Sequence, residues 1–211
     1  MSRRLPSRLY AIADGRAGRD VVDLTARLLD GGARIVQLRW KNATAATFLA
    51  AAAACRRLTR ERGALFVVND RVDVAIACDA DGVHLGQSDL PLGAARRLLG
   101  ETRWIGISTH DLLQARAAAA DGADYIGFGP LFATGTKTTG YAPRGLERLR
   151  EVRRAVGVPI VAIGGIERTH ARHAIDAGAD AVASISALCD PPEPAAAVRA
   201  LLVALGEAES T

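Results

Sequence analysis

The pattern that indicates the fold is clearest in one short stretch, Asp121-Gly122-Ala123-Asp124-Tyr125-Ile126-Gly127-Phe128-Gly129. A glycine turn is followed at once by a short apolar run, which is typical of a buried strand entered from a helix. The same arrangement occurs at Gly32-Ala33-Arg34, at Asp81-Gly82 and at Gly178-Ala179-Asp180, each directly before another apolar run. Glycine suits the left-handed residue that follows a helix, so the recurrence predicts a repeated helix-turn-strand unit.

Short apolar runs and amphipathic stretches alternate along the whole chain. We expect strands at Leu9–Ala13, Ile35–Arg39, Leu65–Val68, Gly82–Leu85, Trp104–Ser108, Tyr125–Gly129, Pro159–Ile163 and Ala181–Ile185. We expect helices near residues 20–30, 44–62, 71–78, 91–99, 111–120, 144–156, 167–177 and 193–205. This alternation, without a linker, predicts a single-domain α/β protein, a (β/α)8 TIM barrel over residues 1–211. Residues 1–8 form a basic tail and 206–211 a polar one. A doubly wound open sheet is the main structural alternative.

The composition is that of a globular core with a modest basic excess. The 211 residues include 27 Lys+Arg and 23 Asp+Glu, a formal charge of +4, and 49% are hydrophobic. No apolar run approaches the roughly 18 residues of a spanning helix, and no signal-type segment follows the basic N-terminus, so we expect a cytoplasmic protein without membrane partners. Acids are interleaved with the basic residues, so nucleic acid is not expected, whereas small anionic molecules are. A homo-oligomer remains open.

Cysteines and histidines offer few candidates for chemistry. Cys55, Cys78 and Cys189 are widely spaced in apolar or alanine-rich settings, which favours buried, inert thiols over a disulfide or metal site. His84 alternates with apolar residues and is interpreted as a satisfied residue of the barrel interior. Only His110, after a predicted strand, is placed near the mouth of a barrel.

Polar residues gather where the predicted strands end. In Gln37-Leu38-Arg39-Trp40-Lys41, the side chains of Gln37, Arg39 and Lys41 share one face of a strand, about 6.6 Å apart. Two cations and an amide in such a row can span a diphosphate, with Arg supplying forked donors and Lys a point charge. The alternative interpretation is a solvated strand end.

Two carboxylates follow the neighbouring strands. Asn69-Asp70 follows the apolar run Leu65–Val68, and Asp89 lies a few residues beyond Leu85. Mg²⁺ is commonly held by one or two carboxylates with waters and substrate phosphates, so the pair is a candidate magnesium site. Asp is also a frequent N-cap, and the spacing alone does not separate the two interpretations.

Small residues follow the last predicted strands. Gly164-Gly165-Ile166 and Ser184-Ile185-Ser186 match the usual phosphate site of a barrel, which uses backbone N–H groups after strands 7 and 8. A plain turn is the alternative at the two glycines. The small-residue loop at 129–140, which contains one lysine, could close over a bound anion.

Taken in order, these residues resemble the thiamine-phosphate synthase family over residues 9 to about 190. The segments that carry the resemblance are Leu9-Tyr10-Ala11-Ile12, Gln37-Leu38-Arg39-Trp40-Lys41, Val68-Asn69-Asp70-Arg71, His84-Leu85-Gly86-Gln87-Ser88-Asp89, Gly106-Ile107-Ser108-Thr109-His110, Asp124-Tyr125-Ile126-Gly127-Phe128-Gly129-Pro130, Thr134-Gly135-Thr136-Lys137, Ala162-Ile163-Gly164-Gly165-Ile166 and Ser186-Ala187. The chain departs from the usual family pattern at Ala133, where many members carry proline, and at Ala13, where threonine is usual.

The resemblance implies a transferase of thiamine biosynthesis. Such an enzyme joins 4-amino-2-methyl-5-pyrimidinylmethyl diphosphate to 4-methyl-5-(2-phosphoethyl)thiazole, giving thiamine phosphate and pyrophosphate by a dissociative mechanism assisted by Mg²⁺. Carried over, the resemblance assigns the pyrimidine diphosphate to Gln37, Arg39, Lys41 and Asn69, and Mg²⁺ to Asp70 and Asp89. It assigns the pyrophosphate region to Ser108 and Lys137, which with Arg39 are the implied catalytic residues. It assigns the thiazole phosphate to Thr134, Thr136, Gly165, Ile185 and Ser186.

Two other functions stay open at this point. One is the thiazole tautomerase branch of the same fold, an isomerase that could use His110 as acid and base. It needs no diphosphate or metal site, whereas this chain has Arg39, Lys41, Asp70, Asp89 and Lys137 together. The other is a non-catalytic barrel that senses phosphate or binds nucleic acid.

Overall fold

The computed structural model describes residues 3–134 and 141–207, and in these ranges eight parallel strands close into a barrel in chain order. The strands are β1 (Leu9–Asp14), β2 (Ile35–Arg39), β3 (Leu65–Asn69), β4 (Gly82–Leu85), β5 (Trp104–Thr109), β6 (Tyr125–Phe128), β7 (Ile160–Ile163) and β8 (Ala181–Ser184). β1 pairs with β8 through Leu9↔Val182 and Tyr10↔Ala183. This pairing confirms the barrel and excludes the open sheet.

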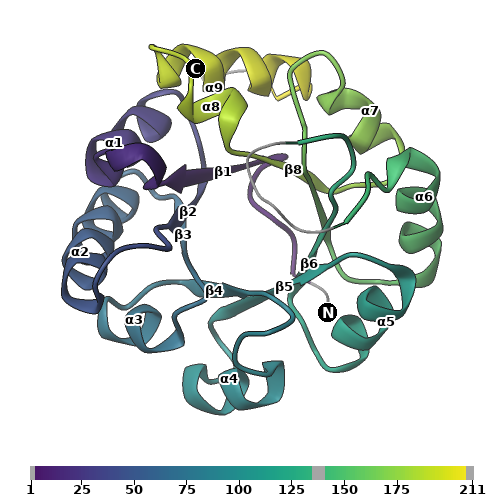
Figure 1. Ribbon diagram of the computed structural model, residues 1–211, viewed down its shortest axis with the longest axis horizontal. Helices are drawn as coiled ribbons and strands as arrows, with labels where there is room; N and C mark the ends of the chain where they lie inside the picture. The colour runs from purple at the N-terminus through teal and green to yellow at the C-terminus, as the bar shows by residue number, and fades with distance from the viewer. Residues whose placement is uncertain (1–2, 135–140, 208–211) are drawn as a thin grey trace.

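The helices form a ring outside the strands, as Figure 1 shows in a view along the barrel. They are α1 (Val21–Asp30), α2 (Ala45–Glu61), α3 (Val72–Ala77), α4 (Leu92–Leu99), α5 (Leu112–Ala120), α6 (Gly145–Ala155), α7 (Ala171–Asp176), α8 (Ser186–Cys189) and α9 (Pro194–Ala204), with a 3₁₀ turn η1 at Arg16–Gly18. The short helix α8, directly after β8, was not expected from the sequence. Four residues are too few to produce a helical period.

Several helices begin at a polar residue just beyond a strand end. The Asp20 carboxylate accepts hydrogen bonds from the backbone N–H groups of Val22 and Asp23, which opens α1. Thr44 caps α2 in the same manner, and Asp111 caps α5. These caps satisfy backbone donors that have no partner inside the helix, so the chain turns from strand to helix within a few residues.

The left-handed glycines occur at three of the four expected positions. Gly32, Gly122 and Gly178 have φ values of 96°, 91° and 106° directly after α1, α5 and α7. At the fourth position the expectation is wrong, because Asp79 (φ 54°) takes the left-handed place after α3. Gly82 instead opens β4, where a Cβ would lie 2.5 Å from the backbone oxygen of Trp104.

An aspartate lies just before each of β4, β6 and β8, and its carboxylate accepts a hydrogen bond from the backbone of the preceding strand. The Asp81 carboxylate accepts from the backbone N–H of Phe66 and pairs with Arg56 of α2. Asp124 repeats this arrangement with Ile105 and Arg96, and Asp180 repeats it with Ile160 and Arg153. Each carboxylate thus ties a helix to the start of two adjacent strands. The repeat seen in the sequence therefore has a structural counterpart.

The core is aliphatic, and its polar members are few. Cys55, Cys78 and Cys189 are buried and unpaired, and burial raises the pKa of the Cys55 and Cys189 thiols to about 11. This agrees with the expectation of buried thiols. Within the described ranges, no helix combines the length and the apolar character that crossing a membrane requires.

Candidate active site

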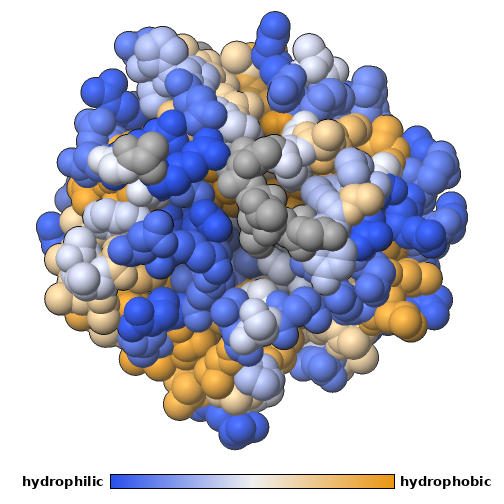
Figure 2. Space-filling model, in the orientation of Figure 1, coloured by the Kyte–Doolittle hydropathy of each residue, from blue (hydrophilic) through white to orange (hydrophobic). Residues whose placement is uncertain are grey.

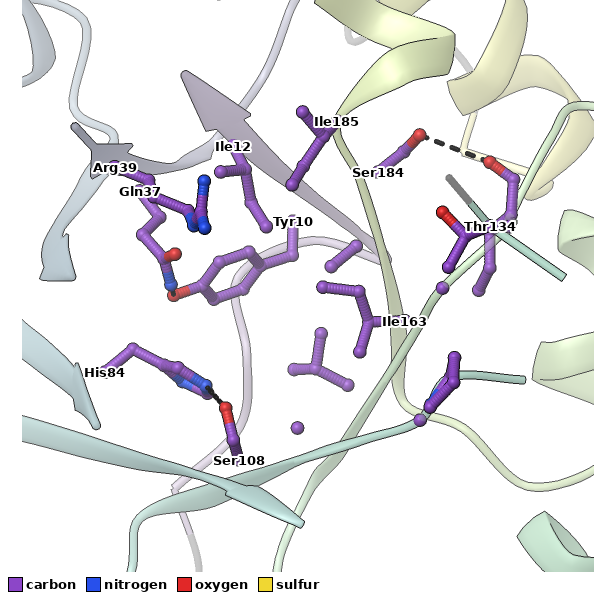
Figure 3. A pocket seen from close by; sticks show the side chains of 18 of the residues that line it. Tyr10, Ile12, Gln37, Arg39, His84, Ser108, Thr134, Ile163, Ser184 and Ile185 are labelled. Atoms are coloured by element: carbon purple, nitrogen blue, oxygen red, sulfur yellow. Dashed lines mark hydrogen bonds between the residues drawn. The ribbon is translucent and has the colours of Figure 1, made fainter. Parts of the chain in front are cut away.

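A pocket opens at the carboxyl ends of the strands, where a barrel carries its chemistry. Residues from β1 to β8 and from the loops that follow them line it. They include Tyr10, Gln37, Arg39, Asn69, His84, Ser108, His110, Tyr125, Thr134, Gly164, Gly165, Ile185 and Ser186. Figure 3 shows several of these side chains converging on one space. Eight of the residues expected to bind substrate therefore share one pocket: Gln37, Arg39, Asn69, Ser108, Thr134, Gly165, Ile185 and Ser186.

Two expected residues cannot be placed. Thr136 and Lys137 lie outside the described residues. The surface around the pocket mouth can still be followed in Figure 2, where hydrophilic residues gather over the ends of β2 and β3. The polar side of the mouth is thus the side from which Arg39 and Lys41 come.

Arg39 is held by a carboxylate that the sequence analysis passed over. Its Nη1 lies 2.5 Å from Oδ2 of Asp14, which is 1% exposed at the end of β1. The other oxygen of Asp14 accepts the backbone N–H of Arg16 at 2.9 Å. The register of β1 and β2 places Asp14 directly opposite Arg39. Asp14 thereby fixes where the guanidinium group sits at the pocket wall.

Lys41, Asp70 and Asp89 form a charged cluster at the rim, next to the pocket but not among its lining residues. The Lys41 Nζ lies 2.8 Å from Oδ2 of Asp70. Asp70 has a left-handed backbone (φ 63°), which Asp tolerates better than most residues, and it turns the chain at the end of β3. The Asp89 carboxylate accepts the backbone N–H of Gly86 at 2.6 Å.

The two carboxylates influence each other's ionisation. Burial raises the pKa of Asp89, and the nearby charge of Asp70 raises it further. Burial opposes ionisation of Asp70 as well, but its hydrogen bond and ion pair with Lys41 outweigh burial and lower the pKa of that carboxyl. Two acids so close repel each other at neutral pH, and a cation between them would relieve that repulsion.

Neither acid caps the helix that follows it. Arg71 occupies the N-cap of α3 and Pro91 that of α4, and neither helix start receives a side-chain cap. The N-cap interpretation of Asp70 and Asp89 is therefore wrong. In the described residues no group of three or more His, Cys, Asp or Glu side chains is arranged to hold a metal. A pair of carboxylates fits Mg²⁺, which takes its remaining ligands from water and phosphate oxygens.

On the opposite side of the pocket the wall is made of backbone and small side chains. Gly164 and Gly165 have φ values of 96° and 64°. A Cβ on Gly165 would lie 2.4 Å from the backbone oxygen of Ala133. Glycine is thus required at Gly165 by both its backbone conformation and the space available. Ser184 Oγ donates to the backbone oxygen of Ile166 at 3.2 Å, which connects the loop after β7 to β8.

The pocket floor holds polar groups that the sequence analysis did not assign to the site. Tyr10 and Tyr125 are fully buried, and their hydroxyl groups lie 2.7 Å apart. His84 of β4 hydrogen-bonds with Ser108 of the adjacent strand β5, as the dashed line in Figure 3 marks. His110, expected near the mouth, lies there: its Nδ1 is 2.7 Å from the backbone oxygen of Gly129.

Comparison with known proteins identifies the family. Residues 9–188 match the family model described as thiamine monophosphate synthase. The chain belongs to the thiamine monophosphate synthase family. As a member it is an enzyme of the transferase class.

Individual relatives agree with this assignment. The thiamine-phosphate synthase of Chloroflexus aurantiacus is 47% identical over 199 residues, covering 92% of this chain and 90% of its own. That of Moorella thermoacetica is 48% identical over 184 residues, covering 87% and 88%. The thiamine phosphate pyrophosphorylase structure from Pyrococcus furiosus superposes with a TM-score of 0.87 at 40% identity and covers 95% of this chain and 96% of its own.

The opposite pKa shifts at the rim predict opposite pH dependences. With a chelator present, Asp70→Asn should become progressively less stable than the parent as pH rises from about 2 to about 5, because it loses a carboxylate whose pKa is lowered in the folded state. Asp89→Asn should become progressively more stable than the parent as pH rises from about 4 to about 7, because the pKa of Asp89 is raised in the folded state. Urea unfolding of the three proteins at several pH values measures both slopes. Parallel slopes for the two variants would contradict this account of the cluster.

Proposed function

We propose that the protein is a thiamine-phosphate synthase that joins the aminopyrimidine methyl diphosphate to the thiazole phosphate and releases pyrophosphate. One observation carries the proposal. Eight of the residues that the family resemblance assigns to the two substrates line a single pocket, and the acidic pair assigned to Mg²⁺ stands at its rim. We also propose that the enzyme acts on these small molecules in the cytoplasm, without nucleic acid or membrane partners.

The diphosphate is assigned to the side of the pocket formed by β2 and β3. Arg39 offers forked donors from a position that Asp14 fixes, and Lys41 adds a second cation next to Asp70. Gln37 and Asn69 lie beside Arg39 in the lining and can hydrogen-bond the pyrimidine ring. With this assignment we expect the leaving group toward the rim and the ring toward the barrel interior.

Asp70 and Asp89 are the residues that would hold Mg²⁺. When bound, the ion would supply positive charge to the diphosphate oxygens, which carry more negative charge than Arg39 and Lys41 balance alone. The ion pair between Lys41 and Asp70 supports this assignment, because it keeps Asp70 ionised and ready to act as a ligand.

The thiazole phosphate is assigned to the side formed by β7 and β8. Barrels commonly bind phosphate through the loops after these strands and through a short extra helix, and α8 begins at Ser186. Gly165, Ile185 and Ser186 line this wall together with Thr134. With one phosphate at each side, the two rings meet in the middle of the pocket.

The chemistry that this arrangement supports is a substitution by prior dissociation. The bond between the methylene carbon and the diphosphate oxygen breaks, and both electrons leave with pyrophosphate. The amino-substituted pyrimidine delocalises the resulting cation, and the thiazole nitrogen then forms the new bond with its lone pair. No general base is required. The protein contributes by fixing both rings and by stabilising charge on the departing oxygens through Arg39 and Ser108.

The direct test mixes the purified protein with both substrates, once with Mg²⁺ and once with a chelator. We expect thiamine phosphate and pyrophosphate in equal amounts, with the metal required because of the charge that must be balanced at the rim. Phosphorus-31 NMR follows both products in one sample. Isomerisation of the thiazole without coupling would assign the protein to the tautomerase branch. Binding of either phosphate without turnover would indicate a sensing barrel, and undiminished coupling in chelator would remove Asp70 and Asp89 from the mechanism.

A second prediction concerns Asp14. Asp14→Asn keeps the size of the side chain but leaves Arg39 without its ionic partner, so kcat/KM for the pyrimidine diphosphate should fall about ten- to hundredfold. The matched control is Asp23→Asn, which breaks an exposed ion pair with Arg27 on α1 and should leave the kinetics unchanged. Steady-state kinetics below the melting temperature of each variant measures this. Unchanged or increased kcat/KM in Asp14→Asn would show that Asp14 competes with the diphosphate for Arg39.

A further inference from the structure

A chain of five polar side chains crosses the interior of the barrel. Gln37 Nε2 lies 2.9 Å from the Tyr10 hydroxyl, which lies 2.7 Å from the hydroxyl of Tyr125. Tyr125 lies 3.1 Å from Nδ1 of His84, and Nε2 of His84 lies 2.9 Å from Oγ of Ser108. The five residues come from β2, β1, β6, β4 and β5. Figure 3 shows both ends of the chain, Gln37 and Ser108, bordering the pocket.

Two glycines make room for this polar chain. A Cβ at Gly106 would lie 2.1 Å from Cζ of Tyr125, and one at Gly127 would lie 3.0 Å from Cε1 of His84. Barrel interiors are more often filled with branched apolar side chains. A buried polar network is stable only when its donors and acceptors are paired, so its presence points to a use beyond packing.

The chemistry of the groups gives the chain a direction. An amide nitrogen only donates, so Gln37 donates to the Tyr10 hydroxyl. The hydroxyl of Tyr125 is then the acceptor available, among the described residues, for the proton of Tyr10. Tyr125 in turn donates to Nδ1 of His84, which puts the ring proton on Nε2. His84 therefore donates to Ser108.

The direction decides what Ser108 can do. Because Oγ of Ser108 already accepts from His84, the hydroxyl proton of Ser108 is left to donate elsewhere, and the pocket lies beside it. We propose that His84 is a positioning residue: held as the Nε2–H tautomer by Tyr125 and Tyr10, it turns the Ser108 hydroxyl proton toward the leaving pyrophosphate. This proposal deepens the function proposed above and rests on it. The opposite direction, with Gln37 accepting and Ser108 donating to His84, is the alternative.

The tautomer of His84 can be measured without any substrate. The chain has four histidines, and a His84→Gln variant identifies the His84 signals in two-bond ¹H–¹⁵N spectra of the labelled protein. We expect the neutral Nε2–H form in the parent. In Tyr125→Phe the donor to Nδ1 is gone, so the Nδ1–H form should become populated. A parent protein in the Nδ1–H form would overturn the proposal.

Kinetic measurements test whether the tautomer of His84 affects the reaction through the Ser108 hydroxyl. Tyr125→Phe should lower kcat about tenfold while leaving the KM for the thiazole phosphate unchanged. In a Ser108→Ala background the same change should alter kcat by less than about twofold, because the hydroxyl it orients is absent. Equal losses in both backgrounds would overturn the proposal. His84→Gln keeps an amide donor where Nε2 stood and should retain more activity than His84→Leu; equal activity of the two would also count against it.

A control variant and the tautomer spectra distinguish failure of this proposal from failure of the proposed function. His173→Gln makes the same substitution on exposed α7 and should leave kcat and KM unchanged. If Tyr125→Phe does not fold, the tautomer of the parent and the comparison of His84→Gln with His84→Leu carry the test. If the parent forms no thiamine phosphate at all, the proposed function fails, and the tautomer spectra still decide the direction of the chain.

Discussion

Parallel pairing of β1 with β8 is the constraint on which the rest of the structure depends, because it closes the sheet and brings every strand end to one rim. Parallel strands all point their carboxyl ends the same way, so residues far apart in sequence become neighbours there. Asp14 of β1 meets Arg39 of β2, and Lys41 after β2 meets Asp70 after β3, only in this register. An open sheet would separate the first strand from the last and divide the pocket.

The closed barrel divides the site into a rim of ion pairs and an interior of hydrogen-bonded polar groups. At the rim, Arg39 and Lys41 are each matched by an acid, which holds these long side chains in place before a diphosphate arrives. In the interior, phenol, imidazole, amide and hydroxyl groups are linked by hydrogen bonds, and burial raises the pKa of both Tyr10 and Tyr125. Such a division suits a reaction in which charge develops on oxygens at the mouth while neutral rings are oriented below.

Much of this could be predicted from the sequence because it depends on local patterns. The eight strands follow from short apolar runs, and Gln37, Arg39 and Asn69 follow from their places at strand ends. Asp14 could not be predicted because its contact with Arg39 depends on the register of β1 against β2. The chain through Tyr10, Tyr125 and His84 could not be predicted because it depends on which strands face each other across the barrel. The helix α8 and the turn at Asp79 were missed for a different reason, since such short segments carry little pattern of their own.

The central claim is that the rim binds a diphosphate together with a divalent ion held by Asp70 and Asp89. Calorimetric titration of the protein with inorganic pyrophosphate, in Mg²⁺ and in chelator, measures this most directly because it requires no turnover. The account predicts clearly tighter binding in Mg²⁺ for the parent, and loss of that difference in both Asp70→Asn and Asp89→Asn. Equal affinity of the parent with and without Mg²⁺, or an undiminished effect of Mg²⁺ in both variants, would contradict it.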